Sequence, residues 1–281
     1  MQKIIPVLFL LAMILASCNF PLAESTPDAN LVSTKVAETL SAVQTQGVPT
    51  LPPPTPVEPP TETPSATLEP SATVTPSATA TAPAGDPVLT LGAPGFYDTF
   101  SDGTSFGLSS KPYEDEAVLI KVENGAMVFE SLRLNNGIRW RLTSRNPQNL
   151  YLDGTFRTTS CSGSDQYGLV VRAPTYSDGI GYYFGVTCDG QYYLLRWDED
   201  GQNSLVDLTV EPKILSGSNQ VNRLGIRISN NSINLYINGY LVKELSDDGI
   251  PGKGYIGAFV SAHEDPGFTV QLEEISLWTL P

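Results

Sequence analysis

The chain has 281 residues, three cysteines and a formal net charge of −14 at pH 7. From Asp86 onward it carries 14 Lys and Arg against 24 Asp and Glu, a net charge of −10, without a basic cluster or stripe. Because phosphate binding requires concentrated Lys and Arg, this balance argues against nucleic acid as a partner.

The N-terminus has the features of a secretory signal. Residues 1–3 are a short basic start, and residues 4–16 are an apolar run too short to span a bilayer. The sequence Leu-Ala-Ser-Cys that ends at Cys18 resembles the bacterial lipobox. The resemblance implies that residues 1–17 are removed and that Cys18 is lipidated, which anchors the protein in a membrane with its domain outside the cytoplasm, at the cell surface. The alternative is an ordinary secretory signal with an incidental cysteine.

Residues 18–47 form the predicted mature N-terminus, and residues 48–85 a linker. Within 28–46 the apolar residues recur at helical spacing, which predicts a short helix, marginal in isolation, rather than a stripe for self-association. The linker is rich in Pro, Thr, Ser and Ala, and repeats Pro-Ser-Ala-Thr from Pro64, Pro70 and Pro76. Such a segment buries too little surface to offset chain entropy, so we expect a disordered tether that reaches on the order of 100 Å.

Residues 86–281 are long enough for one large β-sandwich domain. Turn signals arrive every 8 to 12 residues and no helical period is sustained, which predicts an all-β sandwich or barrel. Asn124-Gly125, Asp189-Gly190, Asp200-Gly201 and Asn238-Gly239 mark the tightest corners. Strands are predicted at 96–100, 117–122, 125–130, 137–143, 150–160, 166–172, 180–187, 191–197, 203–210, 221–228, 232–237, 240–246, 253–261 and 268–278.

The turn at Asp189-Gly190 fixes which residues share a face, if it is a two-residue turn. Cys188 then faces Gln191, and directly opposed residues lie on the same side of the sheet. A bulge would exchange the faces. The predicted core face holds Tyr182, Phe184, Val186, Tyr193, Leu195 and Trp197. The predicted accessible face holds Tyr183, Gly185, Thr187, Tyr192, Leu194 and Arg196.

The turn at Asn238-Gly239 supports the same argument. It predicts a core face and an opposite face for the strands on either side. The core face holds Ile233, Leu235, Ile237, Tyr240 and Val242. The opposite face holds Asn234, Tyr236, Leu241 and Lys243.

Cys161 and Cys188 are an even pair in an exported protein, which predicts one disulfide rather than two free buried thiols. If the strands from 150 to 197 run up and down in sequence, both cysteines lie at the same end of one sheet. The bridge would close a loop of roughly 27 residues and contribute about 3 kcal/mol.

Several motifs resemble the concanavalin A-like lectin/glucanase superfamily. They are Tyr-Gly-Leu-Val-Val-Arg ending at Arg172, Gly-Tyr-Tyr-Phe from Gly181, Asp-Gly-Gln-Tyr from Asp189, Asn-Arg-Leu from Asn222, Leu-Tyr-Ile-Asn-Gly ending at Gly239, and Gly-Tyr-Ile-Gly from Gly254. Within the superfamily, the chain resembles laminin G-like modules and the 3-keto-disaccharide hydrolase-like (family 16 glycoside hydrolase-like) domain. The resemblance implies an antiparallel jelly-roll of two sheets over residues 96–278, with sugars bound on the concave face or at the rim loops.

The chain lacks the Glu-x-Asp-x-x-Glu pattern that marks catalytic family 16 glucanases. Glu114, Asp115 and Glu116 are consecutive, so their side chains alternate faces, and residues 198–201 read as a solvated hairpin tip. His263 is the only histidine, is expected in an exposed loop, and has no Gly-x-Ser-x-Gly partner motif. These features favour a binding protein over an enzyme.

The expected ligand surface is the accessible sheet face around Arg172, Tyr183, Tyr192 and Arg196. Aromatic faces stack on sugar rings, and Arg donates two hydrogen bonds at once to hydroxyl or carboxylate groups. The alternative is that these residues are ordinary strand formers. No cofactor is predicted, although the resemblance admits calcium at the rim, where oxygen ligands are offered by Asp98, Asp102, Asp198, Asp200, Asp247 and Asp248.

The sequence therefore predicts a membrane-anchored surface lipoprotein whose domain binds extracellular polysaccharide or envelope glycan without catalysis. A glycoside hydrolase-like enzyme, and a structural or protein-interaction module of laminin G type, are the alternatives.

Overall fold

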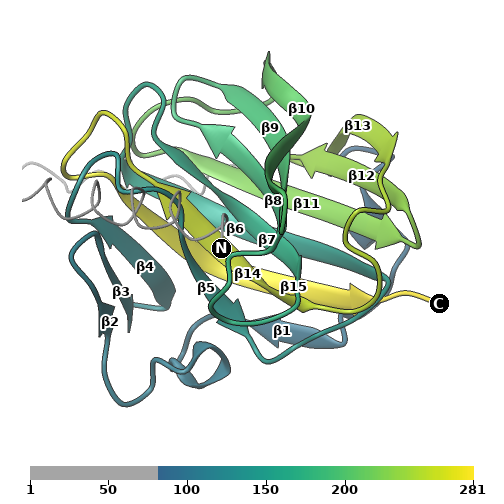
Figure 1. Cartoon of the computed structure of the whole chain (residues 1–281), viewed down its shortest axis with the longest axis horizontal. Helices are drawn as coiled ribbons and strands as arrows, with labels where there is room; N and C mark the ends of the chain where they lie inside the picture. The colour runs from purple at the N-terminus through teal and green to yellow at the C-terminus, as the bar shows by residue number, and fades with distance from the viewer. Residues whose placement is uncertain (1–81) are drawn as a thin grey trace, which may run out of the picture. The chain divides into compact units, whose positions relative to one another are not determined.

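A computed structural model describes residues 82–281 (Figure 1). The predicted signal peptide, the lipidated Cys18, the short helix and nearly all of the linker lie outside the described residues. Within residues 82–281, no helix is long and apolar enough to cross a membrane.

The domain is an antiparallel β-sandwich of two sheets that pack face to face (Figure 1). A nine-stranded sheet has the order β13-β12-β11-β6-β15-β4-β3-β2, and β1 pairs with β15 beside this path. A six-stranded sheet has the order β10-β9-β8-β7-β14-β5. The two sheets confirm the predicted all-β jelly-roll.

The strands match the predicted ranges closely. Only β2 at the sheet edge had no predicted counterpart. The nine-stranded sheet contains β1 (Phe96–Asp98), β2 (Tyr113–Glu114), β3 (Val118–Glu123), β4 (Ala126–Ser131), β6 (Leu150–Ser160), β11 (Val221–Ser229), β12 (Ser232–Ile237), β13 (Tyr240–Ser246) and β15 (Thr269–Thr279). The six-stranded sheet contains β5 (Arg139–Thr143), β7 (Gln166–Ala173), β8 (Gly181–Thr187), β9 (Gln191–Asp198), β10 (Gly201–Val210) and β14 (Tyr255–Ser261). Two short 3₁₀ helices, η1 (Pro87–Leu89) and η2 (Thr104–Phe106), precede β1 and β2.

The predicted meander from 150 to 197 is wrong at its first strand. β6 belongs to the nine-stranded sheet, and the chain crosses to the six-stranded sheet before β7. The predicted disulfide is nevertheless confirmed. Cys161 follows β6, Cys188 follows β8, and their Cα atoms are 5.4 Å apart. The bridge therefore ties the two sheets together at one end rather than two strands of one sheet.

The β8–β9 hairpin differs from the prediction by one residue. Val186 pairs with Tyr192, so the turn is a three-residue turn over 188–190 and Thr187 faces Gln191. The Oγ1 of Thr187 accepts a hydrogen bond from the backbone N–H of Gln191 at 2.9 Å, and Gly190 has a φ of +92°. The faces of β9 are consequently exchanged, because side chains alternate with a period of two. The inner face of this hairpin holds Tyr182, Phe184, Val186, Tyr192 and Leu194.

The β12–β13 hairpin has the predicted two-residue turn. Asn238 and Gly239 have φ values of +51° and +81°, as a type I′ turn requires. Ile233, Leu235 and Ile237 are buried in the core as predicted. Tyr236 lies on the opposite face, as predicted, and is buried there beside Tyr151 and Trp278. Tyr240 is exposed, contrary to the prediction, because β13 lies at the sheet edge.

Candidate functional site

Arg172 lies at the end of β7 and is 2% exposed. Its φ of +55° turns the side chain away from the regular alternation of the strand. The guanidinium donates to the carbonyl oxygens of Ile250 at 2.9 Å, Asn230 at 2.7 Å and Gln148 at 3.3 Å. Arg172 therefore holds three loops together.

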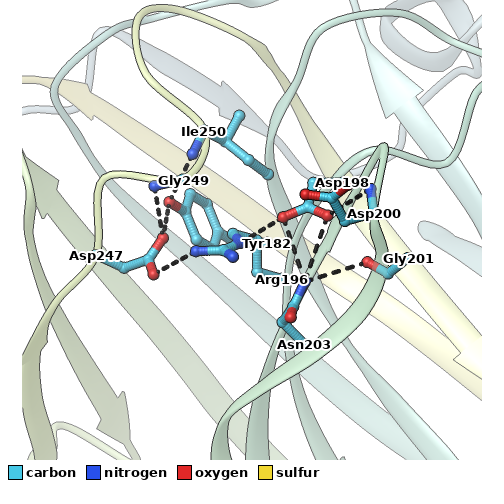
Figure 2. A network of polar contacts seen from close by, with 9 residues as sticks. All are labelled: Tyr182, Arg196, Asp198, Asp200, Gly201, Asn203, Asp247, Gly249 and Ile250. Atoms are coloured by element: carbon cyan, nitrogen blue, oxygen red, sulfur yellow. Dashed lines mark hydrogen bonds and ion pairs between the residues drawn. The ribbon is translucent and has the colours of Figure 1, made fainter.

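Arg196 is the centre of a polar network between β9 and the loop after β13 (Figure 2). Its Nη1 donates to Asp247 at 2.7 Å, and its Nε donates to Asp198 at 2.7 Å. Tyr182 donates its hydroxyl proton to Asp247 at 2.6 Å and accepts from the backbone N–H of Ile250 at 3.1 Å. This network fixes the loop against the six-stranded sheet.

The charge of Asp247 is stabilised by these donors. Burial opposes its ionised form, but hydrogen bonds from Tyr182, Arg196 and the backbone of Gly249 outweigh burial and lower the pKa of the carboxyl group. Because both carboxylates of the network already have partners, Arg196 has a structural role here.

The four residues of the expected ligand surface do not share one accessible face. Tyr192 points into the core because of the register of β9, while Tyr183 lies on the outer face of the six-stranded sheet at 1% exposure. Arg172 is enclosed by loops, and Arg196 lies in the network of Figure 2. The prediction that these residues form an exposed patch is wrong. The one-residue change of register moves Tyr192 and Arg196 to the inner side of the sheet. Tyr183 and Arg172 are covered by neighbouring side chains and loops.

A groove of about 440 Å³ lies on the outer face of the six-stranded sheet. We call it the sheet groove. Side chains from β7, β9, β10 and β14 and from the segment before β5 form it. Its lining residues are Gly137, Ile138, Gln166, Tyr193, Leu195, Trp197, Gln202, Ser204, Val206, Asp207, Leu208, Ser261 and His263.

The floor of the sheet groove comes from alternate residues of β9. Tyr193 is 3% exposed and Trp197 is 37% exposed, so the floor rises from the sheet towards solvent. The ring of Tyr193 lies across Gly185 of β8, where a Cβ atom would collide with it. Its hydroxyl donates to the side-chain oxygen of Gln166 on β7 at 2.6 Å, and burial raises the pKa of Tyr193. The floor is therefore apolar, aromatic and rigidly held.

The far wall is the loop that contains His263. Its ring nitrogens lie 3.1 Å from Ser261 Oγ and 3.2 Å from Asn135 Oδ1. The fully buried Asp165 accepts hydrogen bonds from the backbone N–H groups of His263 at 2.6 Å and Glu264 at 2.8 Å. The predicted loop is present, but His263 is half-buried and lines the groove instead of standing free in solvent.

The sheet groove has one carboxylate, Asp207, among its lining residues. Retaining glycosidases need two carboxyl groups about 5 Å apart, and this lining offers no such pair. Within residues 82–281, no three His, Cys, Asp or Glu side chains form a metal-binding group. Two of the acidic residues considered for calcium, Asp198 and Asp247, are already paired with Arg196.

The sequence did not predict that Trp197, Gln166 and His263 lie close together. The alternation Tyr193-x-Leu195-x-Trp197 is visible in the sequence, but the predicted register placed these residues in the core. The contact between Gln166 and Tyr193 spans 27 positions along the chain and depends on the pairing of β7, β8 and β9.

No family model matches the chain, and no curated protein matches it. Solved structures do. A protein of unknown function with a galectin-like fold from Bacillus subtilis is 10% identical, with a TM-score of 0.50 over 67% of this chain and 96% of that one. A native glycosidic hydrolase is 11% identical, with a TM-score of 0.50 over 67% and 97%. The carbohydrate-binding module CBM66 from Bacillus subtilis is 14% identical, with a TM-score of 0.44 over 53% and 86%. The two matches with a TM-score of 0.50 show that the domain has a galectin-like jelly-roll fold.

Proposed function

We propose that this protein binds carbohydrate in the sheet groove and does not hydrolyse it. The supporting observation is the combination of an aromatic floor with polar walls. Sugar rings present apolar C–H faces that pack on Trp and Tyr, while their hydroxyl groups need donors and acceptors at the rim. Tyr193, Leu195 and Trp197 supply the floor, and Gln202, Ser204, Asp207 and His263 are polar groups at the sides.

The absence of a carboxylate pair among the lining residues supports binding over catalysis. A glycosidic hydrolase has this fold, so the fold itself is compatible with a sugar ligand. In retaining and inverting glycosidases, a second carboxylate acts as nucleophile or base. Asp207 alone has no such partner in the lining of the sheet groove.

A glycan array tests this proposal directly. The chain is produced with Cys18→Ala so that it is not lipidated, and is applied to an array of plant, microbial and animal glycans. We expect binding to a defined group of neutral or acidic polysaccharides. Absence of binding to every glycan would contradict the proposal. A pull-down that captures protein partners but no glycan would favour an interaction module. Release of reducing sugar from a bound polysaccharide would instead indicate a hydrolase.

We further propose that the domain is displayed outside the cytoplasm on a lipid-anchored stalk. The support is the lipobox-like motif ending at Cys18, the Pro-rich linker at 48–85 and the bridge between Cys161 and Cys188, since disulfides persist in oxidising compartments. The wild-type protein should partition into the detergent phase of a Triton X-114 extract. The Cys18→Ala protein should remain in the aqueous phase, and equal partitioning of the two would contradict the anchor.

A further inference from the structure

Arg141 on β5 carries a positive charge that no carboxylate neutralises. None of the ion pairs among residues 82–281 includes it, whereas Arg196 and Arg223 each have two acidic partners. Its Nε donates to the carbonyl oxygen of Phe106 at 2.7 Å and its Nη2 to that of Gly107 at 3.0 Å. Carbonyl groups orient a guanidinium but leave its net charge in place.

The surroundings of Arg141 make this charge unusual. Burial lowers the pKa of its guanidinium, which means that the charged group is partly removed from water. The domain from Asp86 onward has a net charge of −10, so acidic residues are abundant elsewhere. Arg141 is thus half-buried without a carboxylate partner, and its contacts are two carbonyl oxygens and the ring of Tyr113, whose centroid lies 5.5 Å from its Cζ.

Two hollows border this guanidinium. One, of about 480 Å³, lies on the side of η2, and the other, of about 330 Å³, lies on the side of β2. Both are lined by Trp140, Arg141 and Tyr176. The aromatic walls are fixed, because the indole N–H of Trp140 donates to the carbonyl oxygen of Tyr176 at 3.2 Å and Tyr176 stacks on Tyr255 with ring centroids 4.2 Å apart.

The acidic residues near these hollows are already engaged or solvated. Asp115 lies 3.3 Å from Arg139 Nε and accepts hydrogen bonds from Tyr113 and from the backbone N–H groups of Ala117 and Val118. Asp102 accepts from the backbone N–H of Thr104 and is exposed. The remaining charge of Arg141 therefore faces the hollows.

We propose that the edge of β5 binds the anionic group of an acidic glycan, a carboxylate or a sulfate, through Arg141 between the aromatic rings of Trp140 and Tyr176. The inference rests on the proposed function, because it treats this edge as a continuation of the sheet groove. Ile138 lines the sheet groove and Trp140 lines the hollows, and positions two apart in an extended segment are separated by about 6.6 Å. That separation is close to the length of one sugar unit.

Binding to matched acidic and neutral sugars tests this inference. Calorimetric titration of the Cys18→Ala chain with trigalacturonate, its methyl ester and a sulfated chondroitin disaccharide separates carboxylate, neutral and sulfate ligands. We expect an acidic sugar to bind at least tenfold more tightly than the neutral ester. Arg141→Gln should abolish this preference, and Arg141→Lys should retain only part of it. The control is Arg133→Gln, which removes the same charge from an exposed arginine paired with Glu116.

The three tryptophans provide a second readout that separates this inference from the proposed function. Indole N–H signals in a ¹H–¹⁵N NMR spectrum report on the β5 edge through Trp140, on the sheet groove through Trp197 and on the opposite sheet through Trp278. Galacturonate or sulfate should shift Trp140 saturably, methyl galactoside should not, and Trp278 should stay unchanged in every variant that remains folded. A Trp140 shift without any glycan-induced Trp197 shift would support the anion site and contradict binding in the groove. No Trp140 shift with either anion, or an unchanged shift in Arg141→Gln, would overturn the anion site.

Discussion

The ring of Tyr193 on β9 occupies the space that a side chain at Gly185 on β8 would fill. This arrangement lets the tyrosine lie flat on the sheet and reach Gln166 on the next strand but one. The floor of the sheet groove thus depends on Gly185, which is not one of the residues that line the groove.

Substitution of Gly185 by Ala should damage both the fold and the groove. The added methyl group displaces the Tyr193 ring, and such overpacking costs about 1–3 kcal/mol. We expect that decrease in the free energy of unfolding by urea denaturation, together with weaker glycan binding. Gly95→Ala is the matched control, because the nearest atom to its added Cβ would be Leu277 O at 3.8 Å. Equal stability of the two variants would contradict this role of Gly185.

Asp153 should make stability depend on pH between about 4 and 6. Burial raises the pKa of its carboxyl group to about 6, although Arg223 and a hydrogen bond from Tyr151 favour the charged form. The unfolded chain releases this proton near pH 3.9, so the folded state binds it more tightly. The resulting stability is complete below about pH 4 and is lost as the pH rises through about 6, with a maximum of about 3 kcal/mol.

Comparison with Asp153→Asn isolates this effect, because the other titrating groups cancel. The asparagine keeps an acceptor for the hydroxyl of Tyr151, which donates to Asp153 at 2.7 Å in the wild type. We expect the difference in unfolding free energy between wild type and variant to shift in favour of the variant as the pH rises from 4 to 7. Parallel pH profiles would show that Asp153 titrates normally in the folded state.

Arg196→Met should reduce stability without reducing glycan affinity. The change leaves Asp198 and Asp247 without their common partner, which costs about 1–3 kcal/mol. Arg157→Met is the control, since the pair of Arg157 with Glu273 is more exposed and such pairs contribute about 0–1 kcal/mol. A loss of glycan affinity at unchanged stability would assign Arg196 to the ligand site, as the sequence suggested.

Replacing both Cys161 and Cys188 by Ser should lower the free energy of unfolding by about 3 kcal/mol, because the bridge closes a loop over a separation of 27 residues. Denaturant titration of the Cys18→Ala protein with and without the bridge provides the measurement. If the two proteins unfold at the same denaturant concentration, the bridge adds nothing to stability.

Local signals in the sequence predicted the strands and the tight turn at Asn238-Gly239, because alternation and turn chemistry act over a few residues. The register of β9 was not predictable in this way. It depends on whether the turn after β8 has two residues or three, and that difference of one residue decides whether Trp197 faces the core or solvent.

The site was harder to predict than the fold for a related reason. Arg172 reads as a strand residue, but its positive φ and three carbonyl partners depend on loops that lie up to 78 positions away. The sheet groove combines Gln166, Trp197 and His263, which only the pairing of separate strands brings together. The aromatic residues of the sequence pointed to a surface on the six-stranded sheet, whereas long-range pairing selects which of them are accessible.

Binding in the sheet groove is tested most directly by the affinity of Trp197→Ala for a glycan selected on the array, measured by calorimetry beside Tyr240→Ala. Both residues are exposed aromatics, but Trp197 lines the sheet groove and Tyr240 lies on β13 of the other sheet. Binding in the sheet groove predicts at least a tenfold loss of affinity, about 1.4 kcal/mol, for Trp197→Ala alone, with both variants as stable as the parent. Wild-type affinity in Trp197→Ala, or an equal loss in the two variants, would contradict binding in the groove.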